Sequence, residues 1–268
     1  MSERQSTAAK YIFTVTAGRT GTAWLADFLS ANLKVPTIHE PLEIDDFGTR
    51  MPDIKIMRSF NDRGNDELVR NFWKGKLAEI ARQESYAETN HTLAKCGLVE
   101  NLAGSEIAKD SVLVVLRRNR IDQCLSYLAR GDFLNITIDW QWYLSPNYQN
   151  NIINPEIFFK YGQMGRALWY VYEMDVRQHY YIRQYGDALN FIEVDLEQVT
   201  QPPQAKAFLE AIGVSTPVVM PERRNQNAQQ LSGEIADSVA AIVNSINYDP
   251  EALVSHYLAE GRELGQLR

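Results

Sequence analysis

Short blocks of apolar residues alternate with longer amphipathic segments along most of the chain. The apolar blocks are rich in β-branched residues and lack a strict two-residue alternation, as expected of strands that are covered on both faces. We therefore expect buried strands rather than strands with one wet face. The predicted strands are residues 11–16, 35–39, 92–95, 112–116 and 189–194.

The segments between these blocks have helical periodicity. They predict helices at residues 22–31, 67–81, 121–128, 157–184 and 204–212, with two amphipathic helices between residues 228 and 268. Alternating strands and helices predict an α/β fold, a three-layer sandwich in which helices flank a central parallel sheet of about five strands. Because no repeat or composition break marks a linker, we expect a single domain over residues 1–268.

Residues 132–154 differ in composition from the rest of the chain. Trp140, Trp142, Tyr143 and Tyr148 lie there among Asn, Gln, Ser and Pro residues. Long loops in compact domains often cover or bind a ligand. We predict that this segment is a lid or an acceptor-binding loop, and the alternative is that its aromatic residues belong to the core.

Composition narrows the function classes. The 268 residues are 45% hydrophobic and 23% charged, which is typical of a globular protein. The formal net charge of −7 argues against a nucleic-acid partner. No apolar run is long enough to predict a membrane span. Cys96 and Cys124 lack the spacing of a zinc site, so we expect no metal, and reduced thiols in the cytoplasm.

The first candidate site follows the first predicted strand. The chain continues there as AGRTGTAW, residues 17–24. Two glycines and small hydroxyl residues at the start of a helix let several backbone N–H groups meet one anion, and Arg19 adds positive charge. The loop is not a Walker sequence, because no Lys precedes Thr22. It predicts a phosphate-binding site; the alternative is a loop that only turns a strand into a helix.

A second candidate site follows the fourth predicted strand, where residues 117–127 read RRNRIDQCLSY. Arg118 ends the strand, and Ser126 lies two turns into the following helix. Residues 111–130 carry four Arg and one Asp, a local charge of 4 − 1 = +3. Ligands bind at the carboxyl edge of open α/β sheets, so we expect both segments to face one crevice. A solvated surface cluster is the alternative.

Together these segments resemble the PAPS-dependent sulfotransferases, whose donor is 3′-phosphoadenosine 5′-phosphosulfate. The family's first loop has the form PKSGTTWL, on which GRTGTAWL at residues 18–25 lies without gaps. Its second element is an Arg followed eight residues later by a Ser, as in Arg118 and Ser126. The resemblance, closest to bacterial members, implies a P-loop-like fold, PAPS as donor and PAP as product. The residues implied to bind PAPS are Gly18, Arg19, Thr20, Gly21, Thr22, Ala23 and Trp24 around the 5′-phosphosulfate, and Arg118 and Ser126 at the 3′-phosphate.

The general base departs from the pattern of many cytosolic family members, which have a His in a K-T-H segment. Here the matching residues are Lys95, Cys96 and Gly97, so the base position holds a glycine. The second predicted strand ends in His39 and Glu40. Since other branches of the family have a Glu near this strand end, the resemblance implies Glu40 as base, with His39 as the second candidate. Lys95 and Arg19, which replaces the family's usual Lys, would stabilise the transferring group.

Several expectations are less specific. Basic residues of a C-terminal loop often complete the family's 3′-phosphate site, and Arg223 and Arg224 are the matching pair here. The acceptor is expected to be a small molecule, a carbohydrate or a lipid that presents a hydroxyl or amine. Two alternatives stay open: a P-loop kinase that uses ATP, and a non-catalytic relative of the fold. The oligomeric state does not follow from the sequence.

Overall fold

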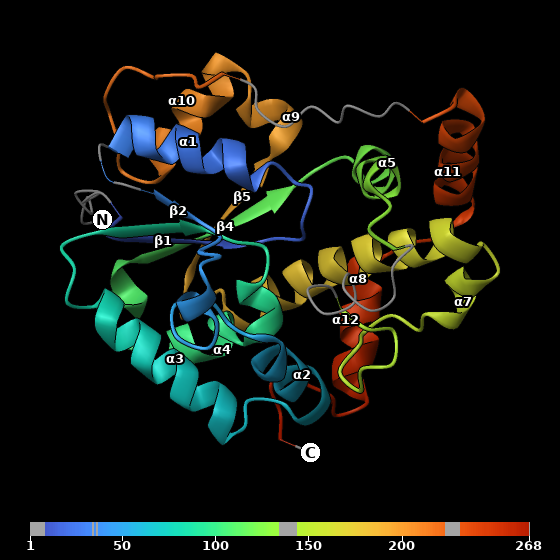
Figure 1. Ribbon diagram of the computed structural model, residues 1–268, viewed down its shortest axis with the longest axis horizontal. Coiled ribbons are helices and arrows are strands. Elements are labelled where there is room, and N and C mark those ends of the chain that lie inside the picture. The colour runs from blue at the N-terminus through green and yellow to red at the C-terminus, as the bar shows by residue number, and fades with distance from the viewer. Residues whose placement is uncertain (1–8, 34, 36, 134–143, 223–230, 268) are drawn as a thin grey trace.

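The structure is a computed structural model that describes residues 9–33, 35, 37–133, 144–222 and 231–267. Within these residues, five strands form one parallel sheet in the order β2-β3-β1-β4-β5 (Figure 1). The predicted α/β fold with a central parallel sheet is confirmed. The strands are β1 (Tyr11–Val15), β2 (Thr37–His39), β3 (Tyr86–Thr89), β4 (Ser111–Arg117) and β5 (Asn190–Asp195).

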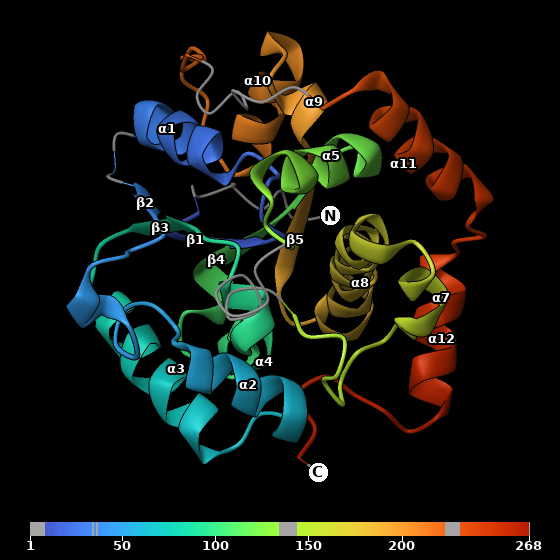
Figure 2. The ribbon, with the colours of Figure 1, turned by 45° about the vertical axis from the view of Figure 1, so that its right-hand side comes forward.

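Helices cover both faces of the sheet, so the molecule has three layers (Figures 1 and 2). Along β4, Val112 and Val114 pack in one core and Leu113 and Val115 in the other, because successive side chains of a strand point to opposite faces. The first core contains side chains of α1 (Thr22–Leu33) and α10 (Pro202–Ala211). The second contains those of α3 (Glu67–Ile80), α4 (Leu98–Ala103) and α8 (Gly162–Tyr185).

The predicted helices are present with small shifts at their ends. The segment predicted as one helix at 157–184 is divided into a short α7 and a long α8. Three of the α-helices among the described residues were not predicted: α2, α4 and α9. Among the described residues, none of the helices is both long and apolar enough to cross a membrane. The remaining helices are α2 (Ile54–Arg63), α5 (Arg120–Arg130), α7 (Glu156–Phe159), α9 (Leu196–Val199), α11 (Gly233–Ser245) and α12 (Pro250–Ala259).

The strand prediction at residues 92–95 is wrong. The third strand is β3, which pairs with β1 and β2, and residues 92–95 lie in and just before a 3-10 helix, η2 (Leu93–Cys96). The sequence YAET of β3 carries a carboxylate, Glu88, that is fully buried. Lys76 of α3 forms a 2.6 Å ion pair with it, and the hydroxyl of Tyr86 donates a hydrogen bond to it over 2.8 Å. A buried ion pair therefore hides this strand from a search for apolar blocks.

The strand order places two loops side by side. β1 and β4 are neighbours in register from Tyr11 opposite Ser111 to Val15 opposite Val115. The chain leaves β1 toward β2 on one side of the sheet and leaves β4 toward β5 on the other. Such a divergence at the carboxyl edge is where open α/β sheets bind ligands. Both sequence motifs follow these two strands.

Candidate functional site

The loop after β1 is held from behind by α5. The carbonyl oxygen of Gly18 accepts hydrogen bonds from the Gln123 side-chain amide over 2.8 Å and from the Tyr127 hydroxyl over 2.6 Å. Thr20 is buried, and its Oγ1 lies 2.7 Å from Oγ1 of Thr16 and 2.8 Å from the Ala17 carbonyl. These contacts fix the loop backbone before any ligand binds.

Arg19 joins the two sequence motifs. Its Nε donates a 2.8 Å hydrogen bond to Oγ of Ser126, and its carbonyl accepts a 3.0 Å bond from Nη1 of Arg118. Arg19 has φ of +62°, a conformation that is uncommon for a residue with a Cβ atom. The structure therefore brings Arg19, Arg118 and Ser126 together at the edge between β1 and β4.

The loop ends at a close approach to α9. Gly21 has φ of +87°, and a Cβ atom there would lie 2.6 Å from Leu196. α1 begins directly afterwards at Thr22, and the first backbone N–H groups of a helix have no partner within it. Ala23 is partly exposed, whereas Trp24 is buried and stacks on Phe28. This end of α1 can bind an anion through its backbone, while Trp24 packs in the core.

Arg118 is held by few polar groups. Its Nε is buried and has no hydrogen bond among the described residues, although Glu197 lies 3.7 Å away. The same carboxylate accepts long hydrogen bonds of 3.3 and 3.4 Å from the backbone N–H of Asn119. Burial raises the pKa of Glu197 above its ordinary value. An arginine with an unpaired donor fits an anionic group, and Glu197 would compete with that group for Arg118.

The carboxyl ends of β2 and β3 carry a second cluster of titratable groups. Glu40 Oε1 lies 3.7 Å from Nε2 of His91, and Nζ of Lys95 lies 2.9 Å from Nδ1 of the same ring. With Lys95 as donor to Nδ1, the neutral imidazole carries its proton on Nε2, which is the ring nitrogen nearer to Glu40. His91 was not singled out in the sequence, since the misplaced third strand hid its position just after β3.

Lys95 is fully buried in η2. Its Nζ also donates a 3.0 Å hydrogen bond to the Tyr170 hydroxyl of α8, and its carbonyl accepts a 2.8 Å bond from Asn61 of α2. Burial lowers the pKa of Lys95 to about 7. Burial, followed by the charge of Lys95, lowers the pKa of His91 well below its ordinary value. These contacts make Lys95 a group that orients His91 from inside the protein.

His39 lies at the exposed end of β2. Its Nδ1 is 2.9 Å from the carbonyl oxygen of Thr89, so this nitrogen carries the proton and donates it. Oγ1 of Thr89 in turn donates a 3.0 Å hydrogen bond to the carbonyl of Thr22 at the start of α1. The ends of β2, β3 and the β1 loop are therefore connected. Glu40, which follows, has φ of +47°.

Two tyrosine rings join the halves of the site. Tyr127, which binds Gly18, packs edge to face against Tyr170, which binds Lys95, with ring centroids 5.6 Å apart. The anion-binding half and the titratable half therefore share one wall, which α5 and α8 form. Within the part of the chain that the structure describes, no group of His, Cys, Asp and Glu side chains could hold a metal ion.

Some predicted site residues cannot be placed. Arg223 and Arg224 lie outside the described residues, as do Trp140, Trp142 and Tyr143 of the predicted lid or acceptor loop. The described part of that loop, residues 144–154, packs largely inward: Leu144 and Asn150 are fully buried. Tyr148 remains half-buried and lines a pocket.

Comparisons with known proteins do not add a family. No family model matches the chain. No curated protein matches its sequence at a significant level. The resemblance to sulfotransferases therefore rests on the two motifs alone.

Proposed function

We propose that this protein transfers a sulfuryl group from PAPS to a hydroxyl or amine acceptor. The observation that carries the proposal is the convergence of Arg19, Arg118 and Ser126 at the carboxyl edge between β1 and β4. The same edge carries Glu40 and its contact with His91. One part of the site thus suits a multiply charged nucleotide, and the adjoining part suits the removal of a proton.

The fit to a bisphosphorylated nucleotide rests on two separate groups of donors. The backbone N–H groups at the start of α1 and the side chain of Arg19 suit the 5′-phosphosulfate. Arg118, whose Nε makes no hydrogen bond to another described residue, suits the 3′-phosphate, and Ser126 lies within hydrogen-bonding distance of Arg19 beside it. ATP has no 3′-phosphate, so the second group of donors favours PAPS.

In the proposed reaction, the acceptor oxygen forms a bond to sulfur while the bond from sulfur to the bridging phosphate oxygen breaks. The electron pair of the broken bond stays on PAP, and the proton of the acceptor hydroxyl passes to the carboxylate of Glu40. Arg19 stabilises the charge that develops on the phosphate oxygen. Lys95 acts through His91, which orients Glu40, and His39 remains the alternative base.

The setting of the reaction is also a proposal. Cys96 and Cys124 are both free and buried. Free thiols are typical of reducing compartments, which supports a cytoplasmic location. The excess of acidic residues, a net charge of −7, argues against a polyanionic acceptor.

The test compares PAP, 5′-AMP and ATP in calorimetric titrations of the full-length protein. We expect PAP to bind at least about tenfold more tightly than 5′-AMP, the size of effect given by a charge-assisted hydrogen bond. Arg118→Met should remove this preference, whereas the exposed control Arg82→Met should keep it. Tighter binding of ATP than of PAP would favour a kinase.

Transfer itself is tested with sulfur-labelled PAPS and a panel of phenols, sugars, lipids and amines. The proposed enzyme is supported if the native protein labels any of these products and a Glu40 variant does not. PAP binding without transfer to any acceptor, and without hydrolysis of the donor, would favour the non-catalytic alternative.

A further inference from the structure

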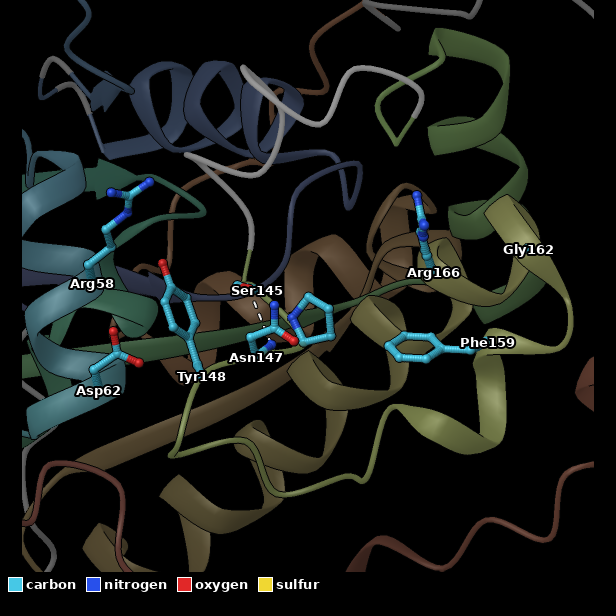
Figure 3. A pocket seen from close by; sticks show the side chains of 9 residues that line it. Arg58, Asp62, Ser145, Asn147, Tyr148, Phe159, Gly162 and Arg166 are labelled. Carbon is cyan, nitrogen blue, oxygen red and sulfur yellow. Dashed lines mark hydrogen bonds between the residues drawn. The ribbon is translucent and has the colours of Figure 1, made fainter.

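A pocket of about 730 Å³ lies beside the site, outside the residues of the proposed reaction. Its walls come from α2, from residues 145–148, from the end of α7 and from the start of α8. Figure 3 shows Arg58 and Tyr148 on one side, Phe159 and Arg166 on the other, and Ser145 between them. The volume is within the range that holds small organic molecules.

The two helices that hold Lys95 also place this pocket next to it. Asn61 of α2 donates to the Lys95 carbonyl, and Arg58 lies three residues earlier on the same helix. Tyr170 of α8 accepts a hydrogen bond from Lys95 Nζ, and Arg166 lies four residues earlier. Residues three or four apart share one face of a helix and are about 5–6 Å apart. The helices α2 and α8 therefore contribute residues both to this pocket and to the contacts of Lys95.

The pocket has an excess of positive charge in an acidic protein. Among the residues that the structure describes, neither Arg58 nor Arg166 forms an ion pair with a carboxylate. In contrast, Arg63 on the same helix as Arg58 pairs with Asp66 at 3.0 Å. Asp62 is the carboxylate among the described lining residues, so the formal charge of this lining is 2 − 1 = +1. This favours a ligand with one negative charge.

The remaining walls offer apolar surface. Phe159 is 45% exposed, and Tyr148 is half-buried opposite it. Burial raises the pKa of Tyr148 to about 12, so its phenol is neutral at ordinary pH. Aromatic rings on two sides of a cavity suit a flat or apolar body.

We propose that this pocket binds a small organic acid, with its acid group at Arg58 or Arg166 and its apolar body between Tyr148 and Phe159. This assignment rests on the proposed function: such an acid is the acceptor, and its hydroxyl or amine is the group that gives up a proton to Glu40. The pocket then selects acceptors by charge, separately from the residues that bind PAPS.

The test is calorimetric titration without PAPS, using mandelate, salicylate and hydrocinnamate, each compared with its primary amide. We expect at least one acid to bind about tenfold or more tightly than its amide. Arg58→Met or Arg166→Met should reduce that preference at least threefold while leaving amide binding within about twofold. Arg63→Met is the matched control on α2 and should keep the preference. Unchanged amide binding shows that the variants fold.

The outcomes separate this inference from the proposed function. Equal binding of all acids and amides, or no binding of any of them, overturns the acid pocket even where PAP binds. An acid preference that survives both arginine substitutions also overturns it. Acid-selective binding that depends on the arginines supports the pocket, and it does so even where PAP fails to bind and the sulfotransferase proposal falls.

Discussion

The guanidinium Nε of Arg19 donates a 2.8 Å hydrogen bond to the hydroxyl of Ser126. These residues belong to different motifs, the first on the loop after β1 and the second on α5. The bond sets the direction of the arginine side chain across the edge of the sheet. Ser126 is almost fully buried, so its contribution to anion binding passes largely through Arg19.

This relationship predicts a non-additive pair of substitutions. Arg19→Ala should weaken PAP binding about tenfold or more, because a charge-assisted contact is lost. Ser126→Ala should have a smaller effect, and the double variant should bind no more weakly than Arg19→Ala alone. Calorimetric titration with PAP measures this double-mutant cycle, and the exposed substitution Ser238→Ala is the control. Additive losses would mean that Ser126 binds the nucleotide by itself.

Glu40→Gln should abolish sulfuryl transfer, because an amide cannot accept the acceptor's proton. PAP affinity should stay within about twofold of the native value, since the carboxylate is not expected to touch the nucleotide. Single-turnover assays with labelled PAPS and titrations with PAP measure the two effects. The exposed carboxylate Asp45 gives a control, Asp45→Asn. If Glu40→Gln retains turnover, Glu40 is not the base, and His39 becomes the candidate.

His91 is predicted to act as a positioning residue for Glu40. His91→Ala should lower kcat about tenfold or more with little change in KM, because Glu40 loses the Nε2–H group that orients it. His91→Gln keeps an N–H donor at a similar distance and should recover a large part of the loss. A purely structural role would lower stability in both variants and give no selective recovery by Gln.

Glu197 is predicted to weaken nucleotide binding. Its carboxylate lies 3.7 Å from Nε of Arg118, where it competes with a phosphate. Glu197→Gln should therefore tighten PAP binding severalfold and leave 5′-AMP nearly unchanged. The control is Glu210→Gln, whose carboxylate pairs with Lys206 on α10. Weaker PAP binding in Glu197→Gln would mean that Glu197 holds Arg118 in place instead of opposing the ligand.

Stability should depend on pH through Glu100 of α4. Burial raises the pKa of this carboxyl from 4.5 to about 8. Between these values the folded protein keeps a proton that the unfolded chain releases, so the free energy of unfolding falls as the pH rises. Urea unfolding at about pH 5 and about pH 9 should show a smaller fall for Glu100→Gln than for the native chain.

The control for this experiment is the exposed Glu106→Gln, which should follow the native chain. Comparison between variants also separates Glu100 from Lys95, which titrates in an overlapping range. An equal fall in the native chain and in Glu100→Gln would show that this carboxyl keeps its charge when folded.

The sequence was sufficient for the fold wherever apolar content follows burial. β1, β4 and β5 lie close to the predicted positions because their side chains face apolar cores. β3 was missed because a tertiary contact, Lys76 with Glu88, compensates a buried charge that no local pattern reveals. α2 was missed although Asp53 caps it and its buried residues Ile56, Met57 and Phe60 have helical spacing.

The site residues that lie at the carboxyl ends of strands could be predicted from the sequence. The convergence of Arg19, Arg118 and Ser126 required only the two motifs and the rule of the carboxyl edge. Tyr170 was not predictable in the same way, because its contact with Lys95 joins η2 to a helix far along the chain. The contact of His91 with Lys95 is local, but the misplaced third strand hid it.

The left-handed backbone at Arg19 and Glu40 has a consequence for how this protein responds to selection. Their φ values of +62° and +47° cost about 1 kcal/mol or more for a residue with a Cβ atom. Glycine adopts this region freely. A library selected for thermal resistance alone should therefore accumulate glycine at the two positions where the proposed chemistry needs a guanidinium and a carboxylate. Improvement of heat tolerance and preservation of turnover are opposing objectives at these two residues.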